Sequence, residues 1–92
     1  MPQGIVQLKE DEFRELTQDG RSVSEYVHKF TELARYASDD VNSEVKKMAR
    51  FLKGLRLELK TILASQDFLS FSHISNKAMQ VERAKEEEKG HL

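Results

Sequence analysis

The chain contains very few residues that interrupt a helix. Its single proline is Pro2, and its four glycines lie far apart, at positions 4, 20, 54 and 90. Between them, apolar residues recur every three or four positions, which is the spacing of one face of an α-helix. No alternation of apolar and polar residues persists long enough to predict a sheet. The sequence therefore predicts an all-α fold, a compact bundle of about five short helices.

The first predicted helix spans about residues 8–17, and its first turn would hold acidic side chains that favour the positive end of the helix dipole. These side chains are Glu10, Asp11 and Glu12. The segment Gln18-Asp19-Gly20 should end this helix. Gly20 is expected to supply the backbone freedom that a sharp turn requires.

A second helix has the clearest start signal in the chain. Ser22 and Glu25 have the spacing of a capping box, in which the serine hydroxyl and the glutamate carboxylate each satisfy an exposed backbone amide. After this cap, apolar residues follow the spacing of one buried helical stripe. The stripe consists of Val23, Tyr26, Val27, Phe30, Leu33, Ala34 and Ala37.

A third helix is predicted to be capped by Asp40 or Asn42 and to end at Gly54. Its apolar residues cover a wider arc than one core contact requires, so they can serve the core on one edge and a partner on the other. The arc contains Val45, Met48, Ala49, Phe51, Leu52 and Leu55. Phe51 and Leu55 are assigned to the core, and the division of the other four between core and interface stays open.

A short fourth helix and a last helix complete the expected bundle. The apolar residues of the fourth are Leu57, Leu59, Ile62 and Leu63. Ser70 or Ser72 is expected to cap the last helix. Its inward residues would be Phe71, Ile74, Ala78 and Val81. Its end is almost entirely charged, which is typical of a solvated helix, and Glu82 and Lys85 there have the spacing of an ion pair.

The segment from Gln18 to Phe30 resembles the major homology region of retroviral and retrotransposon capsids. That region is a glutamine–glycine turn followed by a capped helix with an acidic–aromatic pair and a later phenylalanine. The wider chain, from about Lys9 to Glu86, resembles Gag of plant gypsy-type LTR retrotransposons. The matching pieces, in order, are Glu12-Phe13 with Leu16; Ser22-Val23-Ser24-Glu25-Tyr26; Phe30 with Leu33-Ala34-Arg35-Tyr36-Ala37; Arg50-Phe51-Leu52-Lys53-Gly54-Leu55-Arg56 with Glu58-Leu59; and Ala78 with Glu82.

The resemblance implies a capsid C-terminal domain over residues 8–89, with an N-terminal extension over 1–7 and a C-terminal tail over 90–92. In that family the homology region is a structural brace, whose polar residues tie the turn to the helices that follow. By position, the residues that inherit these roles are Gln18, Gly20, Glu25 and Phe30, with Tyr26 beside them.

The chain departs from the retroviral pattern at three positions of this region. Asp19 separates the glutamine from the glycine, and Arg21 and Lys29 stand where retroviral versions carry Glu and Arg. Lysine offers a point charge rather than the planar fork of arginine. The retroviral charge network is therefore not expected to be copied intact.

In retroviral relatives, the equivalent of the third helix carries the dimer contact through bulky apolar residues. Carried over to this chain, the resemblance yields the hypothesis of a symmetric patch that packs against its own copy. The members of this patch are Val45, Met48, Ala49 and Leu52.

The function implied by the resemblance is structural: a Gag domain that dimerises and links subunits of a retrotransposon virus-like particle in the cytoplasm. Its partners would be its own copies and, in the full-length protein, an upstream capsid N-terminal domain. No enzyme activity, metal or other cofactor is expected, because cysteine is absent, the three histidines fall in separate elements, and no nucleophile elbow or phosphate loop is present.

A membrane role is not expected, because no apolar run approaches a bilayer span. Basic and acidic residues are nearly equal in number, 15 and 16, and are interspersed, so direct nucleic-acid binding by this segment is not expected. The main alternative is a domesticated Gag-derived adaptor that binds a host protein or peptide in an interhelical groove. The sequence leaves this alternative open, because function in a shared fold depends on surface patches.

Overall fold

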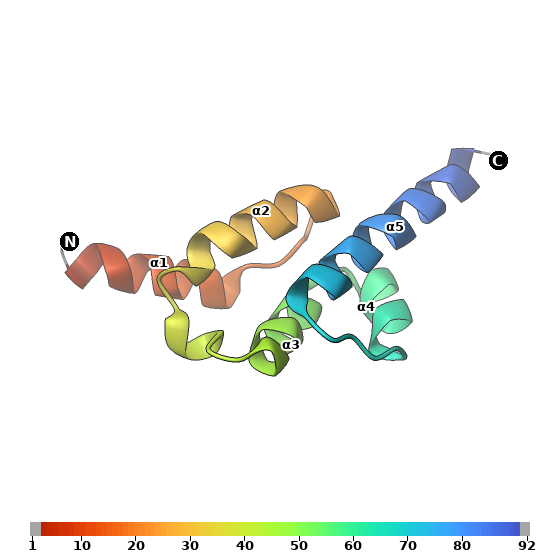
Figure 1. The fold of residues 1–92 in the computed structure, drawn as a ribbon. Helices are drawn as coiled ribbons and strands as arrows, with labels where there is room; N and C mark the ends of the chain where they lie inside the picture. Colours follow the sequence, from red (N-terminus) through yellow and green to blue (C-terminus); the bar gives the residue numbers. More distant parts are fainter. Residues whose placement is uncertain (1–2, 91–92) are drawn as a thin grey trace.

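Residues 3–90 are the part of the chain that the computed structural model describes, and they contain five α-helices and one short 3₁₀ helix (Figure 1). The elements are α1 (Gln3–Glu15), α2 (Val23–Ala34), η1 (Ser38–Asp40), α3 (Glu44–Gly54), α4 (Leu57–Ala64) and α5 (Phe71–Gly90). The predicted all-α fold of five helices is confirmed. Parts of the predicted extension and tail, residues 1–2 and 91–92, lie outside the described residues.

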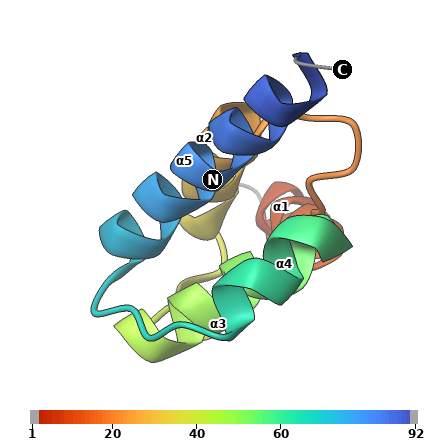
Figure 2. The ribbon, with the colours of Figure 1, turned by 90° about the vertical axis from the view of Figure 1, so that its right-hand side faces the viewer.

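The helices form two layers around one core. Figure 2 shows α2 and α5 in one layer and α3 and α4 in the other. Helix α5 contacts α2, α3 and α4, and α1 packs along α2. The C-terminal half of α5 and the N-terminal half of α1 project beyond the bundle in opposite directions (Figure 1). Helix α5 therefore packs on α2 within its own layer and on both helices of the other layer.

An aromatic cluster fills the centre of the core, and Phe30 of α2 lies in its middle. The Phe30 ring centroid is 5.0 Å from that of Phe13, 5.6 Å from that of Phe51 and 5.1 Å from that of Phe71. Tyr26 stacks on Phe51 with their centroids 5.1 Å apart. Most of these contacts are edge-to-face or offset-stacked arrangements, which stabilise aromatic pairs beyond their buried area. The predicted stripe is buried as expected, except that Val27 is half-buried, and its last member, Ala37, is buried but lies beyond the end of α2.

Helix α1 begins at Gln3, earlier than the predicted start near Leu8. Gly4 lowers helix propensity by only about 1 kcal/mol relative to alanine, so it does not prevent the longer helix. The expected acidic first turn was therefore wrong, since no acidic residue lies in the first turn. Acidic side chains further along the helix form local contacts instead, such as the hydrogen bond from Gln7 Nε2 to Asp11 (3.0 Å).

The serine cap of α2 is confirmed, but the capping box is closed in a different way. Glu25 N–H donates to Ser22 Oγ (3.2 Å), as predicted. The Glu25 carboxylate accepts from the Ser22 hydroxyl itself (3.3 Å). The N–H of Val23, the first residue of α2, donates to Glu82 of α5 (2.9 Å). A distant carboxylate therefore satisfies an amide that begins α2.

Of the cap predictions for α3 and α5, the first is wrong and the second is confirmed. Ser43, rather than Asp40 or Asn42, caps α3, with Lys46 N–H donating to its Oγ (3.2 Å). Asp40 belongs to η1, and its carboxylate forms an ion pair with Arg14 (3.3 Å). Ser70 caps α5, since His73 N–H donates to Ser70 Oγ (3.2 Å), which decides between the two predicted serines.

The turn between α1 and α2 does not use Gly20 in the way the sequence suggested. Asp19 takes the left-handed conformation (φ 47°), and no glycine in the described residues has a positive φ. A methyl group added to Gly20 would meet no atom within 4 Å. Aspartate tolerates the left-handed region better than most residues, so the residue inserted before the glycine makes the turn.

Gly54 ends α3, as predicted, for a reason of packing. A Cβ at this position would collide with the Tyr26 hydroxyl and lie 3.0 Å from Leu16 O. The carbonyl of Gly54 also accepts the Gln18 backbone N–H (2.7 Å). The missing side chain therefore lets the α1–α2 turn approach the end of α3 closely.

Candidate structural brace and interaction surface

Gln18 is a fully buried polar residue in the turn between α1 and α2, with no exposed surface. Its Oε1 accepts the backbone N–H of Arg56 (3.1 Å), and its Nε2 donates to the carbonyl of Arg21 (3.1 Å). Buried polar groups lower stability unless they are hydrogen-bonded, and this side chain is bonded at both ends. Gln18 therefore ties its own turn to the junction between α3 and α4.

Glu82 of α5 completes this set of contacts. One carboxylate oxygen accepts from Val23 N–H (2.9 Å), from the Arg56 guanidinium (3.2 Å) and from Gln18 Nε2 (3.4 Å). The Glu82 side chain is only 15% exposed. We call Gln18, Arg56 and Glu82, with the backbone groups they bond, the Gln18 network. It joins the α1–α2 turn, the start of α2, the α3–α4 junction and α5.

The predicted ion pair between Glu82 and Lys85 does not form. Lys85 instead pairs with Glu58 of α4 (3.7 Å) and with Glu88 (3.6 Å). The spacing on one helix allowed the Glu82–Lys85 pair, but the fold offers Glu82 three donors from other segments. Hydrogen bonds to a partly buried carboxylate are stronger than an exposed helical pair, so the long-range partners prevail.

Arg50 of α3 makes a second tie that sequence reasoning missed. Its guanidinium donates to the carbonyls of Phe13 and Arg14 (3.0 Å) in the last turn of α1 and to that of Leu16 (2.9 Å) just after it. It also lies 5.2 Å from the centroid of the Phe13 ring. A cation is favourable at the negative end of a helix and satisfies its free carbonyls. The only sequence signal was its place in the piece Arg50–Arg56 of the resemblance to Gag.

The five candidate residues of the homology region do not form one group. Tyr26 and Phe30 are fully buried in the aromatic cluster, and Gln18 is buried in its network. Gly20 and Glu25 are exposed, and no hydrogen bond links either residue to the Gln18 network within the described residues. Gln18 and Tyr26 meet indirectly, because both lie against Gly54.

Tyr26 gives the domain a measurable pH dependence. Burial raises its pKa from 10.0 to about 12, opposed in part by the nearby Arg50 charge, and its hydroxyl donates to Phe51 O (3.0 Å). Because the pKa of the folded state lies above that of the unfolded state, stability is retained below pH 10 and lost as pH rises toward 12. We expect urea unfolding to show a loss of about 2–3 kcal/mol across this window.

The control for this prediction is Tyr26→Phe, which keeps the ring and removes the titrating hydroxyl. Below pH 10 the variant should be less stable by about 1 kcal/mol, because it lacks the hydrogen bond to Phe51. Its stability should then fall less steeply than that of the wild type as pH rises. Parallel pH curves for the two proteins would show that Tyr26 does not titrate as described.

The apolar arc of α3 divides between the core and the surface. Phe51 and Leu55 are buried, which confirms their assignment to the core. Val45 is 74% exposed, Ala49 is exposed, and Met48 and Leu52 are half-buried against the core. We call Val45, Met48, Ala49 and Leu52 the α3 face. Their spacing places them along one side of the helix, which is open to solvent at Val45 and Ala49.

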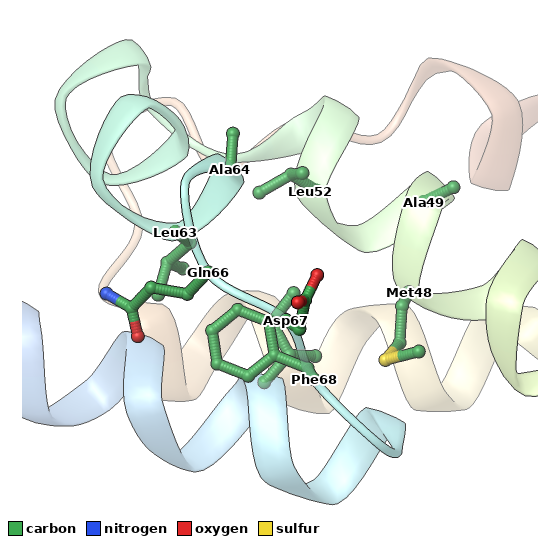
Figure 3. A pocket seen from close by; sticks show the side chains of 9 residues that line it. Met48, Ala49, Leu52, Leu63, Ala64, Gln66, Asp67 and Phe68 are labelled. Carbon is green, nitrogen blue, oxygen red and sulfur yellow. The ribbon is translucent and has the colours of Figure 1, made fainter.

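A groove of about 170 Å³ opens beside the α3 face, between α3, α4, the α4–α5 loop and α5 (Figure 3). Met48, Ala49 and Leu52 contribute to it from α3. Its other lining residues are Leu63, Ala64, Gln66, Asp67, Phe68 and Ile74. Asp67 is the one charged side chain in that lining. Three members of the α3 face therefore also form one wall of this α3 groove.

Neither a metal centre nor a membrane span is found in the part of the chain that the structure describes. Among residues 3–90, no cluster of three or more His, Cys, Asp or Glu could hold a metal ion. Over the same residues, none of the helices combines the length and the apolar character needed to cross a bilayer.

These features define a class: a small all-helical domain in which a buried polar network joins the α1–α2 turn, the α3–α4 junction and α5. Residues 9–84 match the family model described as PEG10/RTL1, C-terminal capsid-like domain, and the chain belongs to this family. Comparisons with curated proteins and with solved structures found no match. The family is Gag-derived and structural rather than enzymatic, and capsid C-terminal domains typically self-associate.

Proposed function

We propose that this domain self-associates through the α3 face and thereby links Gag subunits in the shell of a retrotransposon virus-like particle. The observation that carries the proposal is the exposure of apolar Val45 and Ala49 beside the apolar α3 groove. Contiguous exposed apolar surface of this kind favours protein association. A symmetric contact needs only one such patch, because the same surface serves both copies.

The Gln18 network is proposed to act as the brace that keeps the α3 face in a fixed shape. In the retroviral pattern the homology region itself supplies Glu and Arg, and here Arg21 and Lys29 stand in their places. Glu82 and Arg56 provide a carboxylate and a guanidinium next to Gln18 from other parts of the chain. This arrangement supports a brace of the same kind, built from different positions.

The finer parts of the proposal concern the setting of the domain. The source is proposed to be a gypsy-type LTR element of the plant kind, with particles that assemble in the cytoplasm. In the full-length protein, an upstream capsid N-terminal domain would be the second partner. The five sequence pieces of the plant-type pattern support this setting, and they extend over nearly the same span as the family match.

Val45→Asp is expected to abolish self-association without unfolding the domain. A carboxylate at a residue that is 74% exposed changes the folded monomer little, but in the proposed dimer it would be buried and unpaired. Sedimentation over a range of concentrations would measure the loss, and circular dichroism would check the fold. Met48→Asp tests the same face, but Met48 is half-buried, so Val45 is the cleaner position.

Leu57→Asp is the matched control, because Leu57 begins α4 and is 75% exposed outside the α3 face. It should sediment like the wild type. If Val45→Asp and the wild type associate equally, the α3 face is not the interface. If the wild type stays monomeric at millimolar concentration and its longer parent forms no particles, the assembly function is wrong.

The α3 groove also favours a second candidate function, that of a domesticated adaptor. An apolar groove between helices, with Gln66 and Asp67 at its polar edge, suits an apolar peptide side chain. Because Met48, Ala49 and Leu52 belong to both surfaces, a groove ligand would compete with self-association. A protein that binds such peptides and never dimerises would favour the adaptor.

A further inference from the structure

The two sides of the α3 face carry opposite charge. On one side lies the α3 groove, in which Asp67 is the one charged lining residue. On the other side is a hollow lined by Ala49 with four basic and two acidic side chains. These are Arg14, Lys46, Arg50, Lys53, Asp39 and Asp40. We call the exposed part of the α3 face, Val45 and Ala49, the ridge. Since Ala49 lines both hollows, this ridge separates a basic side of α3 from an acidic side.

The charges nearest the ridge are not neutralised within one copy. Arg50 is engaged with the carbonyls of α1, and Arg14 pairs with Asp40. Lys46, Lys53, Asp39 and Asp67, in contrast, form no ion pair within residues 3–90. The unpaired charge is therefore net positive on the side of Lys46, Lys53 and Asp39, and negative on the side of Asp67. Their charges are therefore available to a second copy that covers the ridge.

A two-fold dimer through this ridge can be built in two ways. If the two-fold axis runs along α3, the two helices are parallel and each ridge residue meets its own copy. The sides are then exchanged, so the basic side of one copy faces the acidic side of the other. If the axis is perpendicular to α3 and lies in the plane of the interface, the helices are antiparallel. The basic side of one copy then faces the basic side of the other, and the acidic sides likewise face each other. Lys46 then lies near the partner's Lys53, and like charges oppose each other.

We propose that the two-fold axis runs along α3, so that the two α3 helices pack parallel and Lys46 of each copy approaches Asp67 of the other. The inference rests on the proposed self-association through the α3 face and adds its orientation. Charge complementarity selects the second copy as the occupant, because the ridge supplies both the basic and the acidic side in one surface.

Disulfide trapping tests the orientation directly, since the natural chain has no cysteine. In the parallel pair, Val45→Cys lies beside its own copy and should form a disulfide-linked homodimer, as should Leu52→Cys. In the antiparallel pair, position 45 lies opposite position 52. The two copies of position 45 would then be about 10 Å apart along the helix direction, which is too far for a disulfide. Leu57→Cys, outside the face, controls for random oxidation.

Mixing the two cysteine variants distinguishes the outcomes. Preferred homodisulfides support the parallel pair, whereas a preferred heterodisulfide between positions 45 and 52 overturns it. A dimer by sedimentation that yields neither product also overturns it. These failures differ from failure of the proposed function, which would appear as a cysteine-free chain that stays monomeric or a Val45→Asp variant that still associates.

Lys46→Glu gives a second test with opposite signs for the two orientations. In the parallel pair the new carboxylate faces Asp67, and the dimer should weaken by about fivefold in Kd. In the antiparallel pair the change relieves repulsion from Lys53, and the dimer should tighten. Adding Asp67→Lys to Lys46→Glu should restore the affinity of the parallel pair, and a tighter Lys46→Glu dimer would contradict the inference.

Discussion

Phe30→Ala is expected to lower the free energy of unfolding by about 3–5 kcal/mol. The Phe30 ring is fully buried and contacts four other aromatic rings, those of Phe13, Tyr26, Phe51 and Phe71. Its removal would leave a cavity that α1, α2, α3 and α5 all border. A domain of this size has a total stability of only about 5–15 kcal/mol, so the variant would be close to unfolding at 25 °C.

Urea unfolding followed by circular dichroism would measure this loss. The control is Leu69→Ala, at a residue that is 89% exposed in the α4–α5 loop, where the change should stay within about 0.5 kcal/mol. A loss below about 1.5 kcal/mol for Phe30→Ala would contradict the arrangement of the core, since such a value is typical of a partly exposed ring.

Gln18→Met is expected to cost about 2–4 kcal/mol, although it nearly conserves the volume of the side chain. Methionine cannot accept the Arg56 N–H well or donate to the Arg21 carbonyl, so both backbone groups lose their side-chain partner. The Glu82 carboxylate would also lose its third donor. The predicted loss therefore comes from unpaired polar groups rather than from a cavity.

The matched control is Gln80→Met, at an exposed position of α5. It should change stability by no more than about 0.5 kcal/mol. If the two variants have equal stability, the Gln18 network contributes nothing to the fold, and its proposed role as a brace fails. A Gln18→Met variant that folds at low temperature would also show whether the brace affects self-association separately from stability.

Local patterns predicted the helices and most of the core. The buried stripe of α2 from Val23 to Ala34, the Ser22 cap and the inward residues Ile74 and Ala78 were found in this way. Each of these predictions depends on contacts within about four residues or on the period of a helix, both of which a sequence displays directly. The start of α1 and the cap of α3 were mispredicted by only a few residues. In each short segment several neighbouring residues can begin or cap the helix, and the sequence pattern does not choose among them.

Long-range polar contacts were not predictable in the same way. Glu82 lies 59 residues from Val23 and 64 from Gln18, so no spacing rule connects them. The spacing along the last helix predicted that Glu82 would pair with Lys85. In the structure Glu82 instead accepts hydrogen bonds from Val23, Arg56 and Gln18. Arg50 likewise has no sequence feature that links it to the carbonyls at the end of α1, which are contributed 34–37 residues earlier.

The sequence by itself determined that this chain forms five helices around an apolar core and carries the resemblance to capsid domains. Only the tertiary structure decided which carboxylate bonds Gln18, why Asp19 rather than Gly20 makes the turn, and that Val45 and Ala49 face solvent while Phe51 faces the core. The physical reason is range: helical periodicity and capping are set by neighbouring residues, whereas burial and polar pairing depend on which helices pack together.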